Sequence, residues 1–143
     1  MGTDYFDTFF NSKGNRQMDD YLNTVNHRVT PEMLKELSRD YIADEIKAAL
    51  FQMGPTKAPG PDGMNALFYQ TFWHIVGIDV VVAVLDFMHS GTMPFDINYT
   101  HIVLIPKVKS PENLFDYRPI SLCTVIYKII SKVLTNRLKI ILP

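Results

Sequence analysis

The segment from residue 101 to residue 122 constrains the fold most, because its apolar and proline residues fix where two strands begin and end. Ile102–Ile105 is a continuous apolar run rich in β-branched residues, which predicts a strand buried on both faces. Pro106 supplies no N–H group, so this strand should end there. After a polar loop, Ile120 and Leu122 flank a serine, which is the alternation of a half-buried strand. The segment therefore predicts an antiparallel hairpin.

Two cations flank the predicted hairpin. Lys107 leaves the first strand after its proline, and Arg118 precedes Pro119, which holds the arginine extended. If Lys107 stands opposite Arg118, the alternate apolar residues of both strands share one face with the two cations. Cations so placed at the open end of the hairpin would make a site for phosphate oxygens. The alternative is that both are ordinary loop-flanking charges, and their spacing alone favours that alternative.

Length and composition indicate a globular chain without a membrane partner. The 143 residues have room for one domain or an incomplete piece of a larger one, and 47% of them are hydrophobic. The longest uninterrupted apolar run, Val80–Leu85, is too short to cross a bilayer, and the start lacks the features of a signal peptide. The single cysteine, Cys123, excludes an internal disulfide and fits a reducing compartment. A nuclear or cytoplasmic location is therefore expected.

The net charge of −1 conceals an asymmetry along the chain. Residues 101–143 carry seven Lys and Arg against two acidic residues, for a net charge of +5. Residues 1–100 carry a net charge of −6. The basic part contains the hairpin, which gives mild support for a polyanionic partner.

Apolar periodicity predicts a mostly helical α+β fold around the hairpin. The helix that opens near the N-terminus carries four aromatic residues on one face and should need a partner surface. Asp62 is expected to cap one helix, and Gly91 to end another that is apolar around most of its circumference and so should be buried. The expected helices cover residues 4–11, Thr30 to about Leu37, and about 43–53, 62–76, 78–89 and 124–141.

Arg137 stands out within the last of these helices. Placing residues at 100° intervals puts Arg137 on the apolar side, where an unpaired charge would be costly. No acidic residue follows Asp116, so any carboxylate partner must lie earlier in the chain.

Four motifs occur in a fixed order along the chain: Lys57–Gly63 (KAPGPDG), Leu104–Lys107 (LIPK), Tyr117–Leu122 (YRPISL) and Tyr127–Leu138 (YKIISKVLTNRL). Together they closely resemble the start of the reverse transcriptase domain of LINE-type (non-LTR) retrotransposons, particularly those of plants. The resemblance extends from about Asp44 to the end of the chain.

The resemblance implies part of an RNA-directed DNA polymerase with a right-hand architecture. Residues 1–42 would be a partly flexible N-terminal extension, and residues 43–143 the fingers, ending before the palm. In such fingers the hairpin cations contact the triphosphate of the incoming nucleotide, which assigns that role to Lys107 and Arg118. The first motif lies near the template strand, and Lys57 is the residue there that could reach a phosphate. The implied partners are an RNA template, a DNA primer, a deoxynucleoside triphosphate, and the missing palm and thumb.

Catalysis in this family requires palm aspartates that hold two Mg²⁺ ions. These aspartates follow the fingers, whereas no acidic residue follows Asp116 here. Asp19 and Asp20 precede the fingers among polar residues and are interpreted as solvated loop charges. The expectation is therefore no catalytic or metal-binding residue and no cofactor in this chain, with Mg²⁺ belonging to the complete family enzyme. These residues alone should not polymerise DNA.

Two alternatives remain open from the sequence. The chain could be a non-catalytic nucleic-acid-binding module that uses its basic C-terminal third, which predicts affinity that falls with salt. It could also be a decayed remnant without function, which predicts an exposed apolar face and poor folding.

Overall fold

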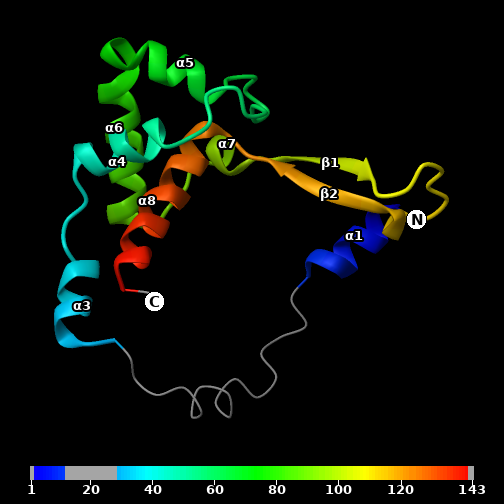
Figure 1. Ribbon diagram of the computed structural model, residues 1–143, viewed down its shortest axis with the longest axis horizontal. Coiled ribbons are helices and arrows are strands. Elements are labelled where there is room, and N and C mark those ends of the chain that lie inside the picture. The colour runs from blue at the N-terminus through cyan, green and yellow to red at the C-terminus, as the bar shows by residue number, and fades with distance from the viewer. Residues whose placement is uncertain (1, 12–28, 142–143) are drawn as a thin grey trace.

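A computed structural model describes residues 2–11 and 29–141, and it shows a helical body from which a two-stranded hairpin extends as an arm (Figure 1). This arrangement confirms the predicted mostly helical α+β class. The elements, in chain order, are α1 (Gly2–Phe10), α3 (Pro31–Leu37), α4 (Ala43–Phe51), α5 (Ala66–Thr71), α6 (Trp73–Ser90), α7 (Phe95–Asn98), β1 (His101–Pro106), η1 (Leu114–Asp116), β2 (Tyr117–Leu122) and α8 (Val125–Ile141).

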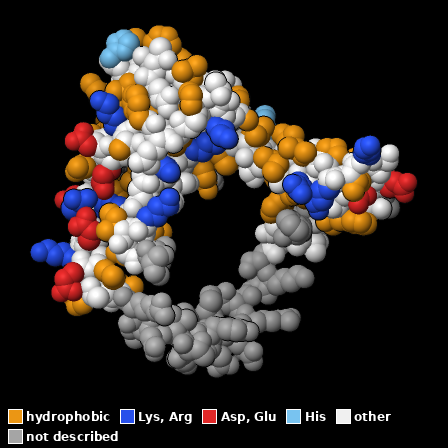
Figure 2. All heavy atoms as spheres, in the orientation of Figure 1, with side chains coloured by type: hydrophobic (Ala, Val, Ile, Leu, Met, Phe, Trp, Pro, Cys, Tyr) orange, Lys and Arg blue, Asp and Glu red, His pale blue; other side chains and the backbone are white. Residues whose placement is uncertain are grey.

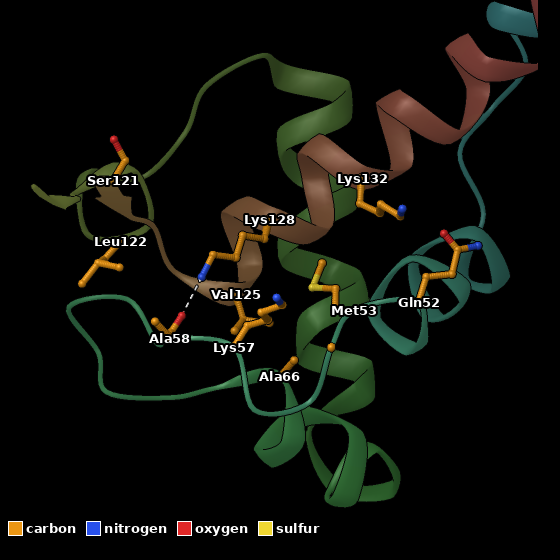
Figure 3. Close-up of a pocket in the computed structure, with 11 residues that line it drawn as sticks. Gln52, Met53, Lys57, Ala58, Ala66, Ser121, Leu122, Val125, Lys128 and Lys132 are labelled. Carbon is orange, nitrogen blue, oxygen red and sulfur yellow. Dashed lines mark hydrogen bonds between the residues drawn. The ribbon is translucent and has the colours of Figure 1, made fainter. Parts of the chain in front are cut away.

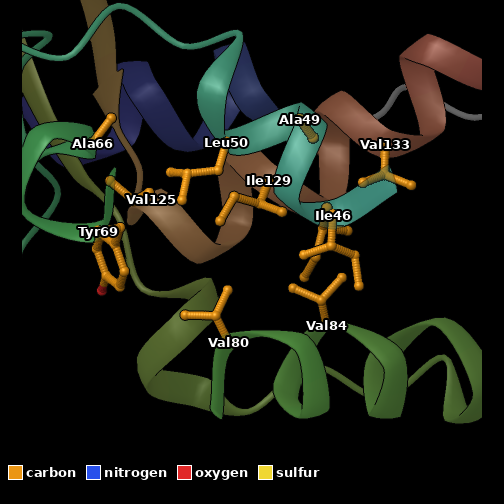
Figure 4. Close-up of a cluster of buried hydrophobic side chains, with 11 residues drawn as sticks. Ile46, Ala49, Leu50, Ala66, Tyr69, Val80, Val84, Val125, Ile129 and Val133 are labelled. Atoms are coloured by element: carbon orange, nitrogen blue, oxygen red, sulfur yellow. The ribbon is translucent and has the colours of Figure 1, made fainter. Parts of the chain in front are cut away.

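The core lies where α4, α6 and α8 meet, with side chains from the three helices pointing toward one another (Figure 4). On α8 the buried residues recur at the spacing of one helix face, and Ile129 and Val133 are almost completely shielded from solvent. Burying one such aliphatic side chain contributes about 1.5–3 kcal/mol. The buried apolar residues are Ile46, Ala49, Leu50, Ala66, Tyr69, Val80, Val84, Val125, Ile129, Ile130 and Val133.

The predicted helix starts at Thr30 and near Thr124 are confirmed. Thr30 accepts a hydrogen bond from the N–H of Met33, and Thr124 accepts one from the N–H of Tyr127. The side chain of Ile42 cannot cap α4, and the Glu45 carboxylate instead accepts a hydrogen bond from the Ile42 N–H at 3.2 Å.

The prediction for residues 62–89 was wrong about where one helix ends and the next begins. Asn65, not Asp62, caps α5 by accepting a hydrogen bond from the Phe68 N–H, while Asp62 accepts one from Met64 within a turn. The break between helices falls at Phe72, and α6 runs straight through Gly77. Gly77 is required for close packing, since a Cβ atom there would lie 2.9 Å from the Trp73 ring.

The expected burial of this apolar helix was also wrong. Val80 and Val84 enter the core, whereas Ile78 is 79% exposed and Ile75 is 64% exposed. Among the described residues α6 alone is long and apolar enough to cross a membrane. Two of its side chains form part of the core, and it carries Asp79 and Asp86. Its length and composition are therefore weak support for a membrane span. The predicted end at Gly91 is confirmed, with φ of 68° and its N–H donated to the Phe87 carbonyl.

The hairpin forms where it was predicted, but its register is shifted by two residues. Ile105 pairs with Arg118 and Val103 with Ile120, so Lys107 does not stand opposite Arg118. The prediction that Ile102–Ile105 is buried on both faces was wrong as well, because every residue of β1 is exposed. The arm projects from the helical body, and β1 hydrogen-bonds only to β2 in the described sheet.

The helix expected near the N-terminus forms as α1 and finds its partner surface on the arm. Tyr5 and Phe6 line a small cavity together with Tyr117 and Pro119 of β2. This packing covers part of one face of the arm (Figure 1). Asp19 and Asp20 lie outside the described residues, as does most of the predicted flexible part of the extension.

Arg137 is only 4% exposed and has the carboxylate partner that its position required. Its Nε and Nη2 atoms donate hydrogen bonds to Glu45 at 3.0 and 2.8 Å. The guanidinium also donates to the carbonyl groups of Leu37, Arg39 and Asp40, and it stacks on the Tyr41 ring. Because Glu45 lies on α4, this network joins the start of α4 and the turn after α3 to the C-terminal half of α8.

Candidate nucleic-acid interface

Lys107 pairs with Asp116 across the hairpin, and Asp116 is two residues before Arg118 on the same strand side. The side chains of Lys107 and Arg118 are held differently. Pro106 has no N–H group, and the Lys107 N–H continues the pairing by donating to the Asp116 carbonyl at 2.7 Å. The Lys107 ammonium donates a hydrogen bond to the Phe115 carbonyl at 2.6 Å, within its own loop. Arg118 is exposed on β2 opposite Ile105.

The two cations do not stand opposite each other, and the Lys107 ammonium is held at the Phe115 carbonyl. Lys107 also lines the small cavity beside α1, together with Tyr117 and Pro119. A phosphate bound by both cations would require Lys107 to leave the Phe115 carbonyl. Their role at a triphosphate stays a prediction.

The loop of the first motif is fixed against the start of α8. Gly60 lies so close to this helix that a Cβ atom would come within 2.6 Å of the Thr124 nitrogen. Lys128 on α8 donates a hydrogen bond to the Ala58 carbonyl at 2.9 Å. Because of these contacts, Lys57 is held beside the first turns of α8, seventy residues further along the chain.

A cavity of about 440 Å³, here called the lysine groove, opens between this loop, the end of α4, the end of β2 and the start of α8 (Figure 3). The side chains of Lys57, Lys128 and Lys132 surround it. The remaining lining residues are mostly apolar or uncharged, namely Gln52, Met53, Gly54, Ala58, Ala66, Ser121, Leu122 and Val125.

The charge of the lysine groove is uncompensated. Within the described ranges its lining contains no Asp or Glu, and none of its three lysines forms an ion pair. The described ion pairs are those of Glu36 and Glu45, and both residues pair with arginines. Three positive charges without counter-charges in one concave surface favour an anionic ligand.

Polar side chains hold the walls of the lysine groove in place. Asn136 on α8 donates a hydrogen bond to the Gln52 side chain at 3.1 Å. Gln70 on α5 donates to the carbonyl groups of Leu50 and Met53 at 3.0 and 3.1 Å, which fixes the C-terminal end of α4. The sequence identified Lys57 but not Lys128 or Lys132 as groove residues, because nothing in the local pattern shows which helix the loop will touch.

Across residues 2–11 and 29–141, no three His, Cys, Asp or Glu side chains lie together as metal ligands. The absence of metal from this chain stays a prediction.

Comparison with known proteins finds a relative among transposon proteins. No protein-family model matches it. A protein of Xenopus laevis described as "Transposon TX1 uncharacterized 149 kDa protein" is 33% identical over 115 residues, which cover 80% of this chain. The chain is related to a transposon-encoded protein. It spans only 9% of the length of that relative.

Proposed function

We propose that this transposon-related chain is the fingers part of the reverse transcriptase of a LINE-type retrotransposon. The observation that carries the proposal is the convergence of three separate motifs on the lysine groove. Lys57 comes from the first motif, Leu122 ends the third, and Lys128 and Lys132 belong to the fourth. Motifs that resemble those of one enzyme family and also meet around one basic surface favour a shared task of binding nucleic acid.

In the proposed function, the lysine groove contacts the template strand and the arm contacts the incoming nucleotide. Lys57 would bind a template phosphate, and Lys107 and Arg118 would bind the triphosphate. The palm and thumb would be structural partners, and the palm would supply the aspartates for Mg²⁺. The chain alone is proposed to be inactive as a polymerase.

Photo-crosslinking with an azido derivative of dATP tests the role of the arm. We expect labelling of the peptide that contains Lys107 and Arg118, competed by unmodified dATP. The double variant Lys107→Gln/Arg118→Gln should lose most of the labelling, because it removes both phosphate-binding cations. Lys109→Gln, an exposed cation of the same loop, is the control and should be labelled like the wild type.

The main alternative is a non-catalytic nucleic-acid-binding module, which is favoured by the uncompensated charge of the lysine groove. The same crosslinking experiment distinguishes this alternative from the proposed function. Such a module would bind RNA or DNA but would show no labelling of the arm by the dATP derivative. Primer extension on a primed RNA with Mg²⁺ and deoxynucleotides tests the expected inactivity. Incorporation above that of a Lys107→Ala/Arg118→Ala double variant would contradict it.

A further inference from the structure

The lysines of α8 form a stripe that continues beyond the lysine groove. At 100° per residue, Lys128, Lys132 and Lys139 fall within about 40° of one another on the helix surface. At 1.5 Å per residue, Lys132 lies about 6 Å from Lys128 along the axis and Lys139 about 10 Å further on. Figure 2 shows Lys and Arg side chains in a row over α8, on the side that faces the arm.

This stripe is open to solvent and has no acidic partner within the described residues. Lys139 is exposed, while Lys128 and Lys132 are partly exposed. The one hydrogen bond that the described structure gives to these three ammonium groups is the bond from Lys128 to the Ala58 carbonyl. A row of cations without acidic partners, spaced by several ångströms, matches a strand of phosphates better than it matches a single small anion.

The lysine groove adds an apolar floor at one end of the stripe. Met53, Leu122 and Val125 are apolar side chains that line the groove together with the lysines (Figure 3). A cavity of about 440 Å³ has the size of sites that bind small organic molecules, and a single base is of that class. A base reaches such a floor only when it is unstacked, as it is in a single strand.

We propose that Lys57, Lys128, Lys132 and Lys139 form one track for the phosphates of a single-stranded nucleic acid, and that the lysine groove receives one of its bases. The inference rests on the proposed function, because it specifies how the template strand would lie. It adds the polar face of α8 and a requirement for an unpaired strand.

Fluorescence polarisation with a labelled uridine oligomer of about 15 nucleotides tests the track, with salt varied from about 50 to 200 mM. Each phosphate contact with a single strand contributes about 0.7 to the slope of log affinity against log salt. The double variant Lys132→Gln/Lys139→Gln should therefore reduce the slope by about 1.4. It leaves the bond from Lys128 to Ala58 intact, so the loop keeps its position.

The matched control is Lys35→Gln/Lys47→Gln, which removes the same charge from exposed positions on α3 and α4. It should leave the slope unchanged. A duplex of the same length should bind more weakly than the single strand. An oligomer with abasic sites should keep the slope but bind about tenfold more weakly, because it cannot bury a base on the apolar floor.

The outcomes separate the inference from the function on which it rests. Equal salt slopes for the two double variants would overturn the phosphate track. Equal affinity for the abasic and the intact oligomer would overturn the base site. If the arm is still labelled by the dATP derivative in that case, the proposed function stands. If the oligomer does not bind even at low salt and the arm is not labelled, both fall. Circular dichroism must show that the variants fold like the wild type.

Discussion

At the scale of single residues, Arg137 shows how a sequence conflict is resolved by tertiary structure. Its position on the apolar side of the last helix predicts a cost unless a partner is found. In the structure the guanidinium donates two hydrogen bonds to Glu45 and others to three backbone carbonyl groups, and it stacks on the face of Tyr41. No local pattern links Glu45 to a residue 92 positions away, so only the need for a partner was predictable.

Replacing Arg137 with methionine should therefore destabilise the chain strongly. The substitution preserves much of the apolar stem but removes the buried donor to three carbonyl groups and two of the hydrogen bonds to the Glu45 carboxylate. We expect a loss of about 3–5 kcal/mol in the free energy of unfolding, measured with urea. Arg39→Gln is the control, because Arg39 is more than half exposed and its surface ion pairs should contribute less than about 1 kcal/mol. Similar losses for both variants would contradict this account.

The pair of Arg137 and Glu45 also predicts that the stability of the chain depends on pH. The hydrogen bonds from Arg137 hold the pKa of Glu45 below its ordinary value. A carboxyl group whose pKa is lower in the folded chain than in the unfolded chain stabilises the folded chain. This contribution is complete at a pH above the unfolded pKa, which is about 4.3, and it is lost as the pH falls through the folded pKa. The stability difference between wild type and Glu45→Gln should therefore be constant near neutral pH and shrink in acid. Urea unfolding across the acid range measures it, and an undiminished difference would contradict the assignment.

At the scale of elements, the first motif is fixed to α8 by Gly60. Its backbone lies too close to Cys123 and Thr124 for any side chain to fit. The sequence showed that prolines would stiffen this loop, but it did not show which element the loop would contact. That information resides in the packing of residues far apart in the chain.

Gly60→Ala should displace the loop from α8 and weaken RNA binding. Relieving the clash requires backbone movement, with an expected cost of about 1–3 kcal/mol. Because Lys57 moves with the loop, affinity for the uridine oligomer should fall as well. Gly63→Ala is a useful comparison, since its φ of 70° gives backbone strain without any nearby atom to meet. If only the stability changes in Gly60→Ala, the loop does not position the groove lysines.

Features that depend on neighbouring residues were predictable from the sequence, whereas features that depend on tertiary contacts were not. Caps such as Thr30 and stops such as Gly91 depend on neighbouring residues, and they were predicted correctly. The antiparallel hairpin was also predicted correctly, whereas Ile120, expected on a half-buried face of β2, is 40% exposed. The burial of β1 and the register near Lys107 were predicted wrongly, since both depend on what surrounds the hairpin. In the lysine groove only Lys57 was predictable, because Lys128 and Lys132 are ordinary polar-face lysines until the fold is known.

At the scale of the whole molecule, apolar surface is exposed on both the arm and the helical body. Ile102, Ile105 and Ile120 on the arm, together with Ile75 and Ile78 on α6, are all at least 40% exposed. Large exposed apolar patches and uncovered strand edges favour association.

The chain should therefore associate reversibly at high concentration through the arm. Ile102→Thr/Ile105→Thr should reduce the association seen by sedimentation velocity, because threonine keeps the β propensity while removing apolar surface. The thermal midpoint should remain close to that of the wild type, since both side chains lie outside the core. A monodisperse wild-type chain at all concentrations would contradict this prediction, and it would also argue against a decayed remnant that folds poorly.

We propose that the motifs of this transposon-related chain meet to bind a nucleic-acid strand. The most direct measurement is photo-crosslinking of the wild-type chain to an oligomer that contains 4-thiouridine, with the attachment sites located by mass spectrometry. The account predicts crosslinks within residues 52–58 and 121–132, which line the lysine groove. Crosslinks confined to α3 and the exposed face of α6, or none at low salt, would contradict it.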